Sequence, residues 1–379
     1  MSTSETPEAQ DAVTETVADT VAETVTTSLA EAATDADREA AAEAAPDAVA
    51  VEAPDAVTDR AADTVTDAVT DRAADTVTDA VAIEGRELSP AVVILSGVVG
   101  GISLTVGALL AVTSLTGHAA GAWVSPEALS PGLVGAAMAG VAPALFTIGR
   151  ARVWEEVRSL VLPLAIVLVG LFAVSLLNGG SLQAVRGGPL FLALFSLGWV
   201  ATLGLLALGA VVCLGAQYRR PAPPAGAARR FVAPLPGWSK PLLAVLGSGW
   251  LGIGAGLLAF PAFWGPLVPW TVNRADAQGL GVWALALGVG VLGSLVEDDL
   301  ARIRPALTAV PAVALATAVV LAVHARAVDW TSGPGASLLA LVTGLFATGV
   351  SGRWLLARAG SSARTAGPSR KGRPYGPRA

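Results

Sequence analysis

The chain is poor in the residues that make disulfides, metal sites and cleavable leaders. Among its 379 residues there is one cysteine, Cys213, so it forms neither an internal disulfide nor a thiolate cluster, and we interpret this residue as a small packing group. Residues 1–88 contain no apolar core followed by a cleavage site, so no secretory signal is expected. Lysine occurs only at Lys240 and Lys371 while Ala, Gly, Val and Arg are abundant, which is typical of a high-GC bacterial genome.

Charge is missing from long parts of the chain. Each charge-free stretch is about as long as the roughly 17–25 residues that a helix needs to cross a bilayer. A helix also satisfies every backbone polar group within such a segment. The sequence therefore predicts an all-α membrane protein with eight transmembrane helices. The stretches are 90–114, 131–149, 159–177, 189–216, 241–264, 279–296, 305–323 and 335–352.

Arginine and lysine gather in every second connection between these stretches. Seventeen of them lie after the second, fourth, sixth and eighth stretches, and the other four connections hold only Arg186, Arg274 and Arg326. By the positive-inside rule, the basic connections face the cytoplasm. The sequence thus predicts that both termini are cytoplasmic, and the bacterial composition favours the inner membrane as the location.

The first 88 residues form an acidic tail of different character. They carry 22 Asp and Glu against four Arg, a charge of about −18, whereas the rest of the chain carries about +12. The unit DAVTDRAADTVT occurs at 55–66 and again at 67–78, and the tail has no aromatic residue. It cannot bury enough apolar surface to offset the entropy lost on ordering, so we predict disorder. A conditional helix that docks on a basic surface is the alternative.

The longest connection divides the membrane part into two halves. Residues 218–240 are rich in Pro and Arg and are predicted to form a cytoplasmic linker. It joins a first half, residues 89–217, to a second half, residues 241–354. A basic cytoplasmic tail, residues 355–379, follows.

The two halves share features that favour an internal duplication. Residues 108–112 (ALLAV) resemble residues 256–260 (GLLAF) at an offset of 148, and Pro163 and Pro311 are separated by the same number. Gly-Pro also opens the fourth and eighth stretches. Two parallel four-helix repeats, related by an axis along the membrane normal, would explain these matches. Chance similarity between apolar helices is the alternative.

Residues around the fifth and sixth stretches resemble a pattern of uncharacterised bacterial multi-pass membrane proteins. In that pattern Trp-Pro-Leu-Thr-Pro-Leu-Thr-Ala-Arg precedes Gly-Ala-Trp, and here Trp270, Gly281 and Trp283 keep the corresponding places. The resemblance covers about a tenth of the chain and implies the membrane class but no known activity. The chain departs from the pattern at Asn273, Arg274, Asp276 and Gln278.

No Asp, Glu, Lys, Arg or His lies in the middle of any stretch. Such a residue costs about 2.5–3.5 kcal/mol at the bilayer centre and usually marks an ion or proton path. Its absence argues against an ion-coupled pump, but not against transport of an apolar or zwitterionic solute. Prolines that fit helices together, or that open a kink or cavity, interrupt four stretches: Pro143, Pro163, Pro261 and Pro311.

Glycine patterns within the stretches predict helix packing. Residues 247–252 match GxGxxG, but they lie inside an apolar stretch rather than between a strand and a helix, so we predict no nucleotide site. Gly97 with Gly101, and Gly252 with Gly256, form small-xxx-small faces that favour close helix contacts.

Two sets of residues are candidate ligands. His118 and His324 fall on the predicted outer side and could jointly bind a haem or metal, but no third ligand stands at helical spacing, so interfacial histidines are the preferred interpretation. The acidic clusters 155–156 and 297–299 lie on the predicted cytoplasmic side. Either they contact a cation or a partner, or, as we prefer, they form salt bridges with nearby arginines: Arg152, Arg158, Arg302 and Arg304.

Tryptophans near the ends of the stretches predict aromatic belts at the two membrane surfaces. The outer belt would hold Trp123, Trp264, Trp270 and Trp330, and the inner belt Trp154, Trp238 and Trp354. Exposed ion pairs, Arg274 with Asp276 and Arg326 with Asp329, are expected in outer loops and would contribute little stability.

The sequence favours no catalytic, cofactor-binding or metal-binding residue, and no nucleic-acid partner. The leading interpretation is a non-enzymatic accessory or scaffold protein in the lipid bilayer, whose acidic tail contacts a cytoplasmic protein; a homo-oligomer is compatible with it. The alternative is a permease for an apolar or amphiphilic solute or lipid. A membrane enzyme is a third interpretation, because no nucleophile–base pair or paired carboxylates can be identified.

Overall fold

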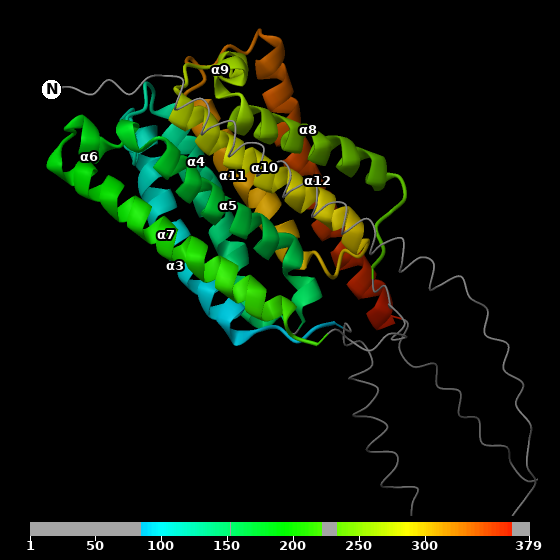
Figure 1. The fold of residues 1–379 in the computed structure, drawn as a ribbon. Helices are drawn as coiled ribbons and strands as arrows, with labels where there is room; N and C mark the ends of the chain where they lie inside the picture. The colour runs from blue at the N-terminus through cyan, green and yellow to red at the C-terminus, as the bar shows by residue number, and fades with distance from the viewer. Residues whose placement is uncertain (1–84, 152, 222–232, 366–379) are drawn as a thin grey trace, which may run out of the picture. The chain divides into compact units, whose positions relative to one another are not determined.

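The computed structural model describes residues 85–151, 153–221 and 233–365. The chain divides into two compact units, Met1–Ala80 and Val81–Ala379, and the described residues all belong to the second (Figure 1). The predicted disorder of the acidic tail and its repeated unit lie outside the described residues. So do Arg152, most of the predicted linker and the last fourteen residues of the basic tail.

Eight long helices make up most of the described chain. All eight are long and apolar enough to cross a membrane, and the described residues contain only isolated β-bridges and no strand. The prediction of an all-α, multi-pass membrane protein is confirmed. The helices are α3 (Pro90–Leu115), α4 (Leu129–Thr147), α5 (Arg158–Leu177), α7 (Leu190–Tyr218), α8 (Ser239–Ala259), α10 (Arg274–Glu297), α11 (Arg304–Val323) and α12 (Gly333–Thr365).

Some helix ends differ from the predicted ones for local reasons. Helix α10 begins five residues earlier than predicted, because the side chain of Asn273 accepts a hydrogen bond from the backbone N–H of Asp276 at 2.8 Å. Helix α8 stops before Pro261, which opens the short helix α9 (Pro261–Trp264). Helix α12 continues to Thr365 and so includes the first eleven residues of the predicted basic tail.

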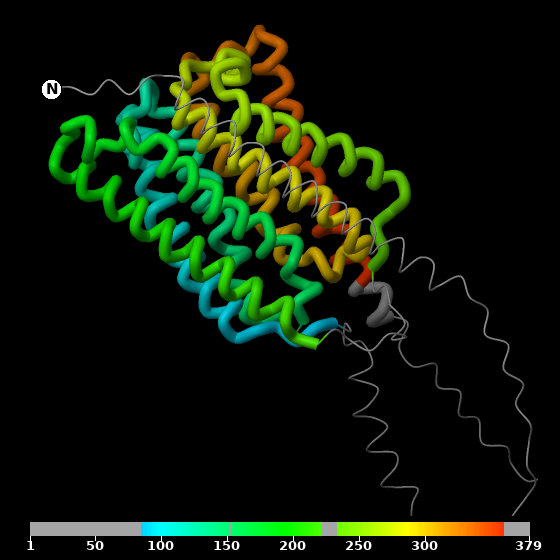
Figure 2. The backbone as a smooth tube through the Cα atoms, in the orientation of Figure 1, coloured from blue at the N-terminus to red at the C-terminus, as the bar shows by residue number. Residues whose placement is uncertain are grey.

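The helices form a layered bundle in which four central helices separate two outer pairs. Figures 1 and 2 show α4, α5, α10 and α11 in the middle, α3 and α7 on one side, and α8 and α12 on the other. The connections after α4, α7 and α10, together with the last turns of α12, lie at one end, which we call the basic end because most Arg and Lys are there. The other connections form the opposite end.

The helix contacts repeat between the two halves. In the first half α3 packs mainly on α4, and α5 on α7; in the second half α8 packs mainly on α10, and α11 on α12. The halves meet where α4 contacts α11 and where α10 contacts α5. Exchanging each helix for its counterpart four spans later turns one of these contacts into the other. The bundle is therefore built as two equivalent four-helix halves.

Glycine allows the closest helix crossing in each half. A Cβ atom on Gly107 of α3 would collide with the backbone of α4 near Gly135, and one on Gly254 of α8 would collide with the backbone of α10 near Gly281. These pairs are related by shifts of 147 and 146 residues. The predicted offset of 148 was therefore wrong by one or two residues, because the apolar residues alone do not fix the alignment.

The predicted small-xxx-small faces are wrong for three of their four glycines. Nothing lies within 4 Å of a Cβ placed on Gly97, Gly101 or Gly252. Only Gly256 packs closely, against the ring of Trp264 at the end of α9. The faces that touch a neighbouring helix are rotated away from the predicted ones, and a spacing of four cannot reveal that rotation.

Backbone hydrogen bonds at the two ends repeat with the same shifts. At each end a connection of one half pairs with another segment of the same half through one backbone hydrogen bond, and the corresponding bond recurs in the other half. The basic-end bonds run from Trp154 N–H to Arg86 O and from Leu300 N–H to Ala233 O, and the opposite-end bonds run from Gln183 N–H to Ala122 O and from Asp329 N–H to Pro269 O.

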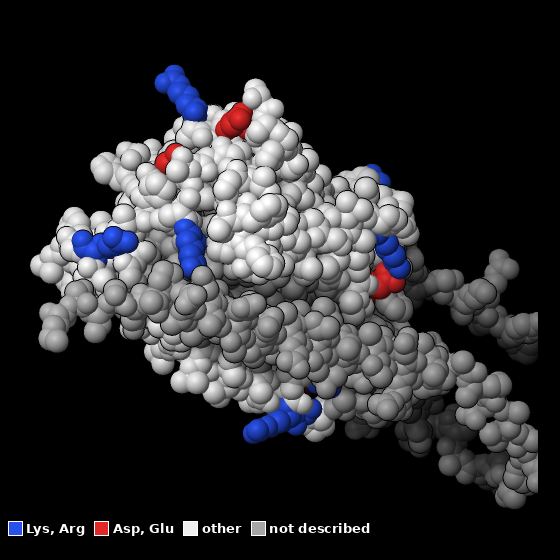
Figure 3. Space-filling view, turned by 45° about the horizontal axis from the view of Figure 1, so that its top comes forward, with Lys and Arg blue, Asp and Glu red and all other residues white. Residues whose placement is uncertain are grey.

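The bundle presents an apolar surface to its surroundings. Leu190, Leu205 and Val245 each expose more than 70% of their side chains, at 76%, 72% and 74%. In the view of Figure 3 wide uncharged areas separate the few Lys, Arg, Asp and Glu side chains. Exposed apolar surface of this extent is unusual in water and fits contact with lipid chains.

Candidate functional site

The largest described cavity lies in the second half, and we call it the α8–α12 cavity. Its volume is about 480 Å³, within the usual range for small-molecule sites. Helices α8 and α12 form its sides, α4, α10 and α11 form its floor, and residues 264–270 cover one end. The lining includes the exposed residues Leu267 and Ser337, so the cavity reaches the apolar surface of the bundle.

Four tryptophans line this cavity, and two of them carry hydrogen-bond donors without acceptors. Trp250 and Trp283 are each 9% exposed, and neither indole Nε1 has a hydrogen-bond partner among the described residues. A buried donor without an acceptor costs about 1–3 kcal/mol. Trp270, in contrast, donates to the hydroxyl of Ser130 at 3.0 Å. The cavity is thus an apolar chamber with two unused donors.

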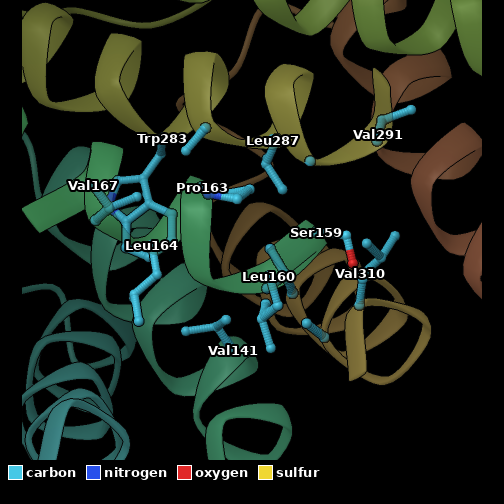
Figure 4. A pocket seen from close by; sticks show the side chains of 15 residues that line it. Val141, Ser159, Leu160, Pro163, Leu164, Val167, Trp283, Leu287, Val291 and Val310 are labelled. Carbon is cyan, nitrogen blue, oxygen red and sulfur yellow. The ribbon is translucent and has the colours of Figure 1, made fainter. Parts of the chain in front are cut away.

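A second, central pocket lies between the two halves. It is lined by α4, α5, α10 and α11 and has a volume of about 60 Å³, enough for a few water molecules only. In Figure 4 the Trp283 side chain projects from α10 towards Val167 and Leu164 of α5. Ser159 contributes a buried hydroxyl without a partner. The contact between the halves is therefore closed at its centre.

Asp276 is buried at the opposite end of the bundle. It is 2% exposed, and its Oδ1 accepts hydrogen bonds from the indole N–H of Trp123 and the hydroxyl of Ser125, both at 2.7 Å. Its Oδ2 has no hydrogen-bond partner among the described residues. The predicted exposed ion pair with Arg274 is wrong, because the early start of α10 turns the carboxylate inward against the first half.

The neighbouring amides extend this link between the halves. Gln278 of α10 accepts a hydrogen bond from Asn178, at the end of α5, at 2.8 Å and donates to the carbonyl of Leu258 at 3.1 Å. Asn273 donates to the carbonyl of Val124 at 2.6 Å. Three of the four departures from the resembled pattern, Asn273, Asp276 and Gln278, therefore take part in contacts within this bundle.

The acidic clusters at the basic end form local contacts, as preferred from the sequence. Glu297 is 1% exposed and forms an ion pair with Arg158 of the other half, while Arg302 lies 4.0 Å from its second oxygen. Asp298 pairs with Lys240 at 2.6 Å. These contacts fasten α10 to α5 and to the start of α8.

Backbone groups account for the rest of these clusters. Glu155 accepts a hydrogen bond from the backbone N–H of Arg86 at 2.8 Å, and Asp299 accepts one from the backbone N–H of Ala233 at 3.1 Å. The two bonds occupy equivalent places in the two halves. They also fix residues 85–88, which the sequence had placed in the acidic tail, against the membrane unit.

The histidines form only local hydrogen bonds. His118 Nδ1 lies 3.1 Å from the Thr116 hydroxyl, and His324 Nδ1 lies 3.1 Å from the carbonyl of Val320. Among the described residues no group of three or more His, Cys, Asp or Glu could hold a metal ion. Cys213 is half-buried on α7 and packs on the core of the first half.

The aromatic belts are predicted correctly in part. Trp238, Trp330 and Trp354 are exposed near the ends of the bundle. Trp123 and Trp154 are buried instead: Trp123 binds Asp276, and Trp154 stacks edge-on against Tyr218 at 5.8 Å. A tryptophan near the end of a span carries no sequence signal that distinguishes lipid contact from a contact with another helix.

The glycine and proline motifs also have structural places. Residues 247–252 lie inside α8, so the GxGxxG match is a helix segment and not a phosphate-binding turn. Pro143, Pro163 and Pro311 lie inside helices, and Pro163 lines the central pocket. Arg326 and Asp329 do not form the expected pair, because Asp329 accepts hydrogen bonds from Thr331 instead.

Fold and site together define an integral membrane protein with an apolar chamber. No protein-family model matches the chain, and comparisons with curated proteins and with solved structures give no match. The resemblance around Trp270, Gly281 and Trp283 is therefore accompanied by no family assignment. What the protein binds has to be argued from its own residues.

Proposed function

We propose that this protein binds an apolar or amphiphilic molecule in the α8–α12 cavity and acts as a permease for it. The observation that carries the proposal is the pair of unused indole donors, Trp250 and Trp283, in walls that are otherwise mainly apolar. A long apolar molecule with a carbonyl or carboxyl group would fill the chamber and accept one of these hydrogen bonds. Lipids and fatty acids have this chemistry.

Entry from the membrane is consistent with the position of the chamber. Its sides belong to α8 and α12, which contact each other much less than each contacts α10 or α11. Both helices present exposed apolar residues, Val245 and Leu339, to the surroundings. A molecule dissolved in the bilayer could therefore enter without leaving an apolar environment.

The repeated halves support the transport part of the proposal. Many transporters consist of two repeats that move against each other around a site between them. Here the halves are joined by polar contacts at both ends, through Asp276 and through Glu297, and only a small pocket separates them. Release of one set of contacts would let the halves tilt.

Binding is tested by narrowing the mouth of the cavity. We expect a photoactivatable diazirine fatty acid, added to the protein in phospholipid nanodiscs, to label peptides of α8 and α12. Ser337→Trp should abolish most of this labelling, because Ser337 lines the cavity and is exposed. Ala340→Trp, on an exposed part of the same helix outside the lining, is the control. Equal labelling of both variants and the wild type would overturn the binding proposal.

Transport is tested separately in proteoliposomes. A fluorescent phospholipid and a fluorescent fatty acid are placed in one leaflet, and their movement is followed with a quencher that cannot cross the membrane. We expect wild-type protein to speed the movement of at least one probe and Ser337→Trp to remove that effect. Labelling of the cavity without any movement would leave a binding protein and eliminate the permease.

We also propose that the protein lies in a bacterial inner membrane with both termini in the cytoplasm. The support is the excess of basic residues at one end, seventeen against three. Gly237→Cys and Ala327→Cys, each in a Cys213→Ser background, place one thiol at the basic end and one at the opposite end. An impermeant maleimide added to intact cells should label only Ala327→Cys; the reverse result would invert the topology.

A second candidate function rests on the acidic tail alone. The charge of about −18 on residues 1–88 favours a non-enzymatic scaffold that contacts a basic cytoplasmic protein. Removing residues 1–84 should then eliminate specific proteins from the set crosslinked to the chain in cells. An unchanged set would contradict this role.

A further inference from the structure

The first half contains a cavity of its own, which we call the α3–α7 cavity. Its volume is about 310 Å³, and it is lined by α3, α4, α5 and α7 together with Trp283 of α10. Gly198 of α7 is exposed and belongs to the lining, so this cavity also reaches the surface of the bundle. Nothing in the contacts between the halves described above requires such a space.

The two cavities occupy equivalent places in the internal repeat. Residues of the α3–α7 cavity recur, 146 or 147 positions later, in the lining of the α8–α12 cavity. Each cavity also receives residues from the second helix of the other half: Trp283 reaches the first, and Ala137, at the equivalent position, reaches the second. The equivalent pairs are Ser103 and Trp250, Val106 and Ile253, Met138 and Ala284, Val167 and Val313, Leu171 and Thr317, and Phe195 and Leu341.

The α3–α7 cavity has its own unused donors. Trp199 is 8% exposed, and its indole Nε1 has no hydrogen-bond partner among the described residues; Trp283 is in the same state. Trp283 lines both cavities, because it projects from α10 towards α5 of the first half (Figure 4). Donors from α7 and α10 thus face a space whose walls are otherwise almost entirely apolar.

Side-chain size makes the first cavity narrower than the second. Met138 and Phe195 stand where the second half has the smaller residues Ala284 and Leu341. The space that remains suits a single unbranched chain better than a branched or two-chain lipid. A free fatty acid has such a chain, and its carboxyl oxygen can accept a hydrogen bond from an indole N–H.

We infer that the α3–α7 cavity is a second binding site, selective for single-chain amphiphiles with one carbonyl or carboxyl acceptor. The inference rests on the proposed function in one respect, namely that cavities of this bundle take up apolar molecules from the membrane. It goes further in assigning two separate sites with different width. Trp283 belongs to both sites, and Trp199 and Trp250 belong to one each.

The test uses the full chain in nanodiscs with two photoactivatable probes, a diazirine fatty acid and a two-chain diazirine phospholipid, and identifies labelled peptides by mass spectrometry. The fatty acid should label α7 as well as α8 and α12, and the phospholipid should label α8 and α12 only. Gly198→Phe should remove the fatty-acid label from α7 and leave that on α12. A side chain at Gly198 meets nothing within 4 Å, so the variant should fold.

Matched variants separate site-specific effects from general ones. Gly215→Phe, on the same helix, is also free of neighbours within 4 Å and lies outside the lining, so its labelling should equal that of the wild type. Trp199→Phe keeps most of the ring but removes the donor, and should weaken fatty-acid retention on α7 about fivefold, the equivalent of one hydrogen bond. Trp283→Phe should weaken both sites.

The outcomes distinguish this inference from the proposed function. Label on α8 and α12 with none on α7 would overturn the second site and leave the proposed function intact. Label on α7 that persists at full strength in Gly198→Phe would also overturn it. Label on α7 alone would support the second site and contradict the proposed one, and no protection of either helix would contradict both.

Discussion

The two halves of this bundle have the same backbone contacts but different polar groups. The glycine crossing, the backbone bonds at both ends and the two cavities recur with shifts of 146 or 147 residues. The buried charges do not recur. Glu297 of the second half corresponds to Ala151 of the first, and the indole of Trp123 donates to a carboxylate while that of Trp270 donates to a hydroxyl. Helix geometry is thus set twice by the same means, and the charged contacts between the halves are supplied mainly by α10.

The largest expected effect concerns the ion pair that has no counterpart in the first half. Glu297→Gln removes the carboxylate that lies beside Arg158 and Arg302, and Arg302 is almost fully buried. An unpaired buried charge should cost about 3 kcal/mol of unfolding free energy. Thermal unfolding in detergent micelles measures the loss, and Ala151→Gln, at the equivalent position, is the control and should be close to neutral. A neutral Glu297→Gln would mean that solvent reaches these arginines.

The glycine crossings test whether the halves are equally tight. Gly107→Ala and Gly254→Ala each place a Cβ against the backbone of the partner helix and should cost about 1–3 kcal/mol. Gly97→Ala and Gly252→Ala meet nothing within 4 Å and should cause no loss, because alanine favours the helix. The comparison uses unfolding in the same micelles. Similar losses for all four variants would show that the crossing glycines are not special.

The indole bonds at the opposite end sharpen the contrast between carboxylate and hydroxyl. Asp276→Ala removes an acceptor of two hydrogen bonds and should cost about 1.5–3 kcal/mol, whereas Ser130→Ala removes one neutral bond and should cost about 1 kcal/mol. Limited proteolysis of the connections at this end and thermal unfolding would measure both. A larger loss for Ser130→Ala would reverse the proposed asymmetry.

The smallest effect is a difference in pH response between equivalent positions. Asp329 of the second half is fully exposed, and hydrogen bonds from the side chain and backbone of Thr331 hold the pKa of its carboxyl below the ordinary value. A lowered pKa means that these bonds contribute above the ordinary pKa and are lost as the pH falls through the lowered one. The equivalent residue of the first half, Gln183, does not titrate.

Hydrogen exchange measured between about pH 6 and pH 3, corrected for the intrinsic rate, would detect the difference. Protection near residues 329–332 should fall at the acid end, while protection near residue 183 should not. In Thr331→Val the pKa of Asp329 should return towards its ordinary value, and the fall should begin at higher pH. Parallel behaviour of the two connections would contradict the assignment.

Hydropathy and charge predicted the spans because crossing a bilayer is a local requirement. A segment must be apolar, helical and long enough, and each of these properties can be read from neighbouring residues. Local rules also explain the errors. The cap at Asn273 moved the start of α10, and that shift buried Asp276, which the apolar stretch 279–296 had left outside. The tryptophans and glycines failed because their partners lie on other helices.

The sequence by itself determined the class of protein, the number of spans, and the concentration of basic residues at one end. It also indicated the existence of a repeat, because similar residues recur along the chain. Only the tertiary structure decided which glycines cross, which tryptophans are buried and where the cavities lie. Those features depend on how each apolar helix is rotated against its neighbours, and nearly uniform apolar surfaces leave that rotation undetermined until the helices pack.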